Sequence, residues 1–136
     1  MVDFNNTTTK HLEDKTMNKE FVPYELAVKL KEFGFDEPCF GCYDDKAVFG
    51  LTVMSIKQYY TNSKEDTWNC AAPTFSEAFR WFREKYDLNY VIVKAESWFY
   101  TINGCNTQEG FNTYEEAELA CLTKLIEIVQ GGQDNE

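Results

Sequence analysis

Residues 74–78 (TFSEA) and residues 113–117 (TYEEA) decide the fold, because each stretch places a glutamate three residues after a threonine. This is the pattern of a capping box, in which the two side chains accept hydrogen bonds from backbone N–H groups at a helix start. A run with apolar residues at helical spacing follows each box. We therefore predict that one helix begins after Thr74 and another after Thr113.

Both predicted helices are amphipathic. The first has one apolar face, formed by Phe75, Ala78, Phe79, Phe82 and Tyr86. The second has an apolar stripe formed by Tyr114, Ala117, Cys121, Leu125 and Ile128. Three further apolar residues widen this stripe, namely Leu122, Ile126 and Val129. Such faces must pack against another element, and we predict that Gly131-Gly132 end the second helix.

An earlier helix is predicted from Pro23 to Gly34. Proline suits the first position of a helix, and a glycine just past the end can adopt the left-handed conformation. This terminator would let Phe35 fold back onto Leu30.

Runs rich in β-branched and aromatic residues lie between the helices. A hairpin is expected from 39–43 and 47–60, followed by a strand at 67–70 and later by strands at 90–95, 98–103 and 105–111. Because short turns favour antiparallel pairing, we expect an α+β fold, an antiparallel sheet with three amphipathic helices in the order α-β(3-4)-α-β(2-3)-α.

The 136 residues suit one domain. Residues 1–19 are polar and lack either hydrophobic period, so we expect a mobile N-terminal tail. We assign 20–130 to a single domain and 131–136 to a flexible C-terminus.

The formal net charge is −10, and residues 105–136 hold seven acidic residues against the single Lys124. Since unspecific nucleic-acid binding depends on Lys and Arg contacts to phosphates, this charge makes it an unlikely function. The acidic surface serves solubility in one interpretation and acts as a decoy for a basic partner surface in the other.

The cysteine count is odd, and no apolar stretch resembles a secretion signal or membrane span, which favours a reduced cytoplasmic setting. Cys39-Phe-Gly-Cys42 has the spacing of half a zinc site, which would be completed only if Cys70 and Cys105 converged on it. We favour structural thiols, with no metal or cofactor, and read Cys121 as a core residue.

Catalytic patterns are scarce. The single histidine, His11, lies in the expected tail, and no glycine-rich phosphate loop is present. Asp44, Asp45 and Glu96 fall in expected turns, where solvated acids are common. The sequence therefore favours a protein that is not an enzyme.

Two groups of residues suggest binding instead. Arg80, Trp81 and Arg83 lie outside the apolar face of their helix, and Arg and Trp are enriched in binding hot spots. The alternative for Trp81 is internal packing, with a cation–π contact to Lys85. A second group of strand aromatics could stack nucleic-acid bases or simply fill the core, namely Tyr59, Tyr60, Trp98, Phe99 and Tyr100.

Three stretches resemble a family of small uncharacterised proteins encoded by gut bacteria and their phages. They are FVPYELAVKLKEFGFDEPCF (21–40), APTFSEAFRWFREKY (72–86) and TYEEAELAC (113–121), and the resemblance covers most of 17–130. It implies a small accessory or host-interaction role and assigns no activity or site. The family pattern often has tyrosine in place of Cys42, which argues against the zinc interpretation.

Taken together, these observations favour a non-enzymatic interaction protein with an unknown protein partner, which binds through Arg80, Trp81 and Arg83 or through the acidic C-terminal region. A nucleic-acid-binding α+β module is the alternative.

Overall fold

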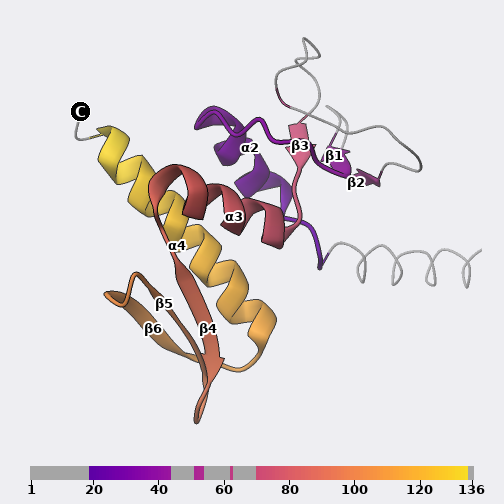
Figure 1. Ribbon diagram of the computed structural model, residues 1–136. Coiled ribbons are helices and arrows are strands. Elements are labelled where there is room, and N and C mark those ends of the chain that lie inside the picture. The colour runs from indigo at the N-terminus through magenta and orange to yellow at the C-terminus, as the bar shows by residue number, and fades with distance from the viewer. Residues whose placement is uncertain (1–18, 44–50, 54–61, 63–69, 135–136) are drawn as a thin grey trace, which may run out of the picture.

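Figure 1 shows the computed structural model of the chain, which describes residues 19–43, 51–53, 62 and 70–134. Residues 1–18 of the expected tail, the turn at 44–46, most of the expected strand at 47–60 and residues 67–69 of the expected strand at 67–70 lie outside these residues. The predicted α+β class and element order are confirmed. In chain order the elements are α2 (Tyr24–Glu32), β1 (Gly41–Tyr43), β2 (Leu51–Val53), β3 (Cys70–Ala72), α3 (Phe75–Tyr86), β4 (Tyr90–Lys94), β5 (Trp98–Ile102), β6 (Asn106–Phe111) and α4 (Tyr114–Asp134).

The described strands form two antiparallel sheets rather than one. In the first, of order β2-β1-β3, Gly41 of β1 is opposite Val53 of β2 and Ala72 of β3. The second is a meander of order β4-β5-β6. The pairing of β5 with β6 shifts register between Trp98 and Phe99, which face Phe111 and Glu109 and leave Gly110 as an extra residue in β6. Gly110 has a φ of 97°, a left-handed value that glycine adopts without strain.

The end of α2 matches its prediction. Gly34 has a φ of 94°, and the Phe35 N–H donates to the Leu30 carbonyl at 2.9 Å. The Gly34 N–H donates to the Lys31 carbonyl at 3.0 Å, which completes a Schellman motif. Phe35 and Leu30 both enter the core, so this turn delivers an aromatic ring to the interior.

The two predicted capping boxes differ in detail. At α3 both bonds form, because the Glu77 N–H donates to Thr74 Oγ1 at 3.2 Å and the Thr74 N–H donates to Glu77 Oε1 at 2.7 Å. At α4 the Glu116 N–H donates to Thr113 Oγ1 at 3.1 Å. The Glu116 carboxylate, however, accepts from the N–H of Asn112, one residue earlier than predicted, also at 3.1 Å.

The predicted end of α4 is wrong. The helix continues through Gly131 and Gly132 to Asp134, so most of the expected flexible segment is helical. A glycine inside a helix costs about 1 kcal/mol and does not forbid the conformation. Buried Ile126 and Val129 in the preceding turns anchor this end of the helix.

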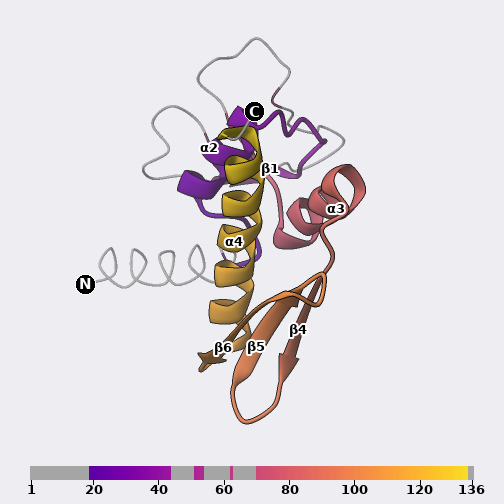
Figure 2. The same cartoon turned by 90° about the vertical axis from the view of Figure 1, so that its left-hand side faces the viewer.

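Helix α4 forms the centre of the arrangement. It contacts all three strands of the β4-β5-β6 sheet as well as α2 and α3. Figures 1 and 2 show the sheet beside the N-terminal half of α4 and α2 beside its C-terminal half. Most of the predicted apolar stripe is fully buried, including Cys121, Leu122 and Leu125, so one core joins both sheets through α4.

Replacing Thr74 with alanine is expected to lower the free energy of unfolding by about 1 kcal/mol, because the Glu77 N–H loses its acceptor. Thr113→Ala should cost less, since that cap is exposed. Urea denaturation of both variants measures the difference, and Thr74→Ser should behave like wild type. A larger loss for Thr113→Ala than for Thr74→Ala would contradict this ranking of the caps.

Candidate functional site

The structure separates the three residues that the sequence grouped on α3. Trp81 is only 5% exposed, whereas Arg80 and Arg83 are exposed. The indole packs edge-on against Phe35, Phe82 and Tyr86, with ring centroids 5.3, 5.1 and 5.3 Å away. Internal packing is therefore the role of Trp81, and its ring is not available to a partner.

Lys85 completes this environment. Its Nζ lies 5.1 Å from the centroid of the Trp81 ring, which forms the cation–π contact considered from the sequence. The Phe35 side chain that covers Trp81 comes from the Schellman turn after α2. Gly34 allowed this turn to be predicted from the sequence. That prediction placed Phe35 against Leu30 and did not include its contact with Trp81.

Three of the cysteines are buried around the first sheet, namely Cys39, Cys42 and Cys70. Burial raises the pKa of Cys39 far above its ordinary value and raises the pKa of Cys70 to about 11. Cys105 is exposed in the turn between β5 and β6, on the other sheet. Among the described residues no three metal-ligating side chains gather. With these raised pKa values, the thiols of Cys39 and Cys70 are protonated at neutral pH, and a protonated thiol is a poor nucleophile and a poor ligand.

Cys121 lies in the core on α4, as predicted, and is fully buried. Burial raises the pKa of its thiol to about 12. It packs as a small apolar residue.

The three strand aromatics that the structure describes, Trp98, Phe99 and Tyr100, do not form one stacking platform. Trp98 and Tyr100 lie on the face of β5 that α4 covers, where Trp98 meets Tyr114 edge-on and Tyr100 is buried. Phe99 alternates to the opposite face, as predicted from the strand period. Tyr59 and Tyr60 lie outside the described residues.

That opposite face of the β4-β5-β6 sheet is exposed, and we call it the outer sheet face. Val91 is 50% exposed and Val93 is 39% exposed, and cross-strand pairing places Phe99 and Glu109 in line with Val93. A hollow of about 510 Å³ beside Phe99 is bordered by Glu96 and Glu109. The sequence signal was the apolar run 91–93, because such a run puts apolar side chains on both faces of a strand.

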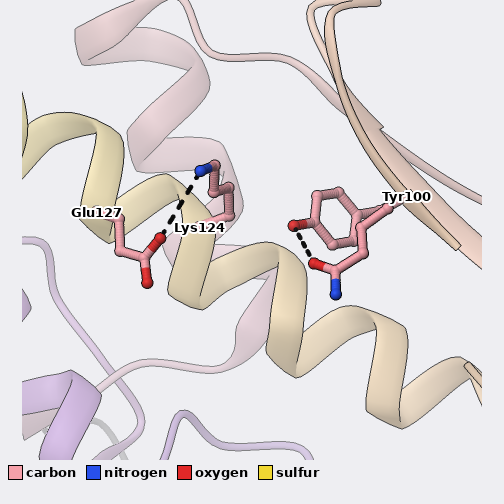
Figure 3. A network of polar contacts seen from close by, with 4 residues as sticks. Tyr100, Lys124 and Glu127 are labelled. Atoms are coloured by element: carbon pink, nitrogen blue, oxygen red, sulfur yellow. Dashed lines mark hydrogen bonds and ion pairs between the residues drawn. The ribbon is translucent and has the colours of Figure 1, made fainter.

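A groove of about 600 Å³ runs between β6 and α4. Tyr100 and Lys124 border it, and Figure 3 shows the polar contacts on its walls. The Tyr100 hydroxyl donates to Gln108 Oε1 at 3.1 Å, and Lys124 Nζ lies 3.8 Å from Glu127 Oε2. No sequence pattern pointed to this groove, because it depends on how α4 crosses the sheet.

Charge is unevenly divided over the molecule. The segment 87–134, which forms the β4-β5-β6 sheet and α4, carries two lysines, Lys94 and Lys124. Against them stand eight acidic residues, Asp87, Glu96, Glu109, Glu115, Glu116, Glu118, Glu127 and Asp134. Both the outer sheet face and the groove therefore lie in a region of negative potential.

Within the described ranges, no helix is both long enough and apolar enough to cross a lipid bilayer. Comparisons of the chain with protein-family models, with curated proteins and with solved structures find no match.

Proposed function

We propose that this chain is a non-enzymatic protein-interaction domain that binds a basic segment of a partner protein. The observation that supports this function is the outer sheet face, where Val91, Val93 and Phe99 lie beside Glu96 and Glu109. Contiguous apolar side chains that remain in contact with water are typical of surfaces that bind other proteins. The accessory role that the family resemblance implies, in a phage or mobile element, fits such a domain.

The chemistry of the partner follows from charge. Two carboxylates border the hollow beside Phe99, and the surrounding segment 87–134 is strongly acidic. A lysine or arginine could lay its aliphatic stem on the aromatic ring and its charged end between the carboxylates. A basic partner is therefore favoured over nucleic acid, whose phosphates this surface would repel.

The cellular setting belongs to the same proposal. All five cysteines are free thiols, including the exposed Cys105. Free thiols are typical of reducing compartments, so we propose that the domain meets its partner in the cytoplasm.

The exposed arginines of α3 are the competing surface. With Trp81 in the core, Arg80 and Arg83 lack the aromatic anchor that made this face attractive as a binding site. Two exposed guanidinium groups alone would favour an acidic partner, which is the opposite of the partner proposed here.

A display library of random peptides distinguishes these two surfaces. Selection on the wild-type chain is expected to enrich basic peptides that bind Arg80→Ala/Arg83→Ala normally and lose binding to Val91→Arg/Val93→Arg. The two valines and the two arginines are all exposed, so both double variants should keep the wild-type melting temperature. Enrichment of acidic peptides that need the two arginines, or no enrichment at all, would overturn the proposal.

A further inference from the structure

We infer that the groove between β6 and α4 binds an extended basic segment, which adds to the β4-β5-β6 sheet as a fourth strand beside β6. This inference rests on the proposed function and names the site at which the partner segment would bind.

β6 is suited to strand addition because it is an edge strand. It ends the order β4-β5-β6, so within the described chain no strand pairs with the backbone groups on its outer side. Its residues 106–110 are exposed. An exposed edge offers a row of N–H and C=O groups to an incoming chain, which is the basis of peptide recognition by strand addition.

The other edge of the sheet is less suited. Tyr90 at the start of β4 stacks on Phe79 of α3, with ring centroids 4.0 Å apart. Helix α3 therefore lies beside that end of β4, whereas the groove lies along β6.

Helix α4 forms the opposite wall of the groove. Its lining residues recur at helical spacing on one stripe, namely Glu116, Leu119, Ala120, Thr123, Lys124 and Glu127. This stripe is distinct from the buried stripe around Cys121 and Leu125. Leu119 is 40% exposed, so the groove offers an apolar contact that the fold itself does not use.

Alternation of side chains defines how a bound strand would fit. Every second side chain would point toward α4 and meet Leu119 and Thr123, and the others would extend the outer sheet face beside Thr107 and Glu109. One extended segment would thus use both the groove and the proposed interaction face. Because β6 has six residues, the paired segment is about six residues long.

The charges of the groove indicate a basic occupant. Two glutamates of the α4 wall, Glu116 and Glu127, stand against Lys124 in the groove. Glu109 of β6 adds a third carboxylate on the outer sheet face. Lys124 is 3.8 Å from Glu127, so part of its charge is already compensated. An incoming strand with alternating cationic and apolar residues matches this arrangement on both of its faces.

The test uses a synthetic decapeptide that alternates arginine and valine, titrated into the full chain by calorimetry. Leu119→Arg should weaken its binding about tenfold, because the new side chain fills the groove and repels the peptide. Tyr24→Arg is the matched control, because Tyr24 is 47% exposed and lies on α2, outside the groove. This variant should bind the peptide as wild type does. Amide hydrogen exchange in β6 should slow when the peptide is bound.

Two methylated peptides test backbone pairing directly. One carries N-methyl groups on the valines and the other on the arginines, so each blocks one edge of the peptide strand without changing its charge. Binding should fall about tenfold for at least one of them. Equal binding of all three peptides, or no binding of the unmodified peptide, overturns strand addition. If peptides selected from the library depend on Val91 and Val93 but are insensitive to Leu119→Arg, the groove inference fails while the proposed function stands.

Discussion

Replacing Trp81 with alanine is expected to lower the free energy of unfolding by about 3–5 kcal/mol. The indole is buried among Phe35, Phe82 and Tyr86, and its removal would leave a cavity where α3 meets the turn after α2. The Lys85 ammonium would also lose its contact with the ring. Urea denaturation followed by far-UV circular dichroism measures the loss.

The matched control changes the neighbouring side chains on the same helix. Arg80→Ala and Arg83→Ala should each shift the unfolding free energy by no more than about 0.5 kcal/mol, because both side chains are exposed. Trp81→Phe should recover part of the loss, since a smaller aromatic ring fills part of the cavity. A Trp81→Ala variant as stable as the arginine variants would refute burial of the indole.

The amount of the fold that the sequence predicts depends on how local each signal is. Thr74 and Glu77 cap α3 as expected, and Gly34 ends α2 as expected, because both motifs involve neighbours a few residues apart. The end of α4 was missed, since Gly131 and Gly132 resemble a stop signal when only local preference is considered. Buried Ile126 and Val129 decide in favour of the helix.

The candidate site was harder to predict because it is made by tertiary packing. The sequence located Trp81 outside the apolar stripe of α3, but only the position of Phe35 decides that it is buried. The groove between β6 and α4 is likewise lined by residues far apart in the sequence, such as Gln108 on β6 and Lys124 on α4. Hydrophobic periodicity reports which face of an element is buried and does not report which elements meet there.

Glu118 is expected to make the protein less stable as the pH rises from about 4.5 to about 7. The pKa of this half-buried carboxyl is raised from 4.5 to about 7, chiefly by desolvation and in part by the charges of Glu20 and Glu115, against the hydrogen bond from the Tyr114 side chain. The folded chain therefore holds this proton more tightly than the unfolded chain. Between the two pKa values, unfolding releases the proton, so stability falls with increasing pH.

Glu118→Gln should remove this dependence. The variant is expected to be more stable than wild type by about 1–2 kcal/mol at pH 8, after allowance for the partial exposure of the carboxyl. At pH 4 the two proteins should be nearly equal, because Glu118 is then largely protonated in both the folded and the unfolded chain. Glu115→Gln is the matched control, since Glu115 is an exposed acid three residues earlier on the same helix. Its own effect should be small, acting mainly through the weak repulsion that it exerts on Glu118.

Urea denaturation at several pH values between 4 and 8 gives the two stability curves. They should diverge through the range from about 4.5 to 7 and run parallel above it, because beyond the folded-state pKa both chains have lost the proton. Curves that stay parallel across the whole range would show that Glu118 titrates alike in the folded and unfolded chain. Its carboxyl would then be solvated in the folded protein, and the packing of Tyr114 and Glu118 at the start of α4 would have to be looser than the structure has it.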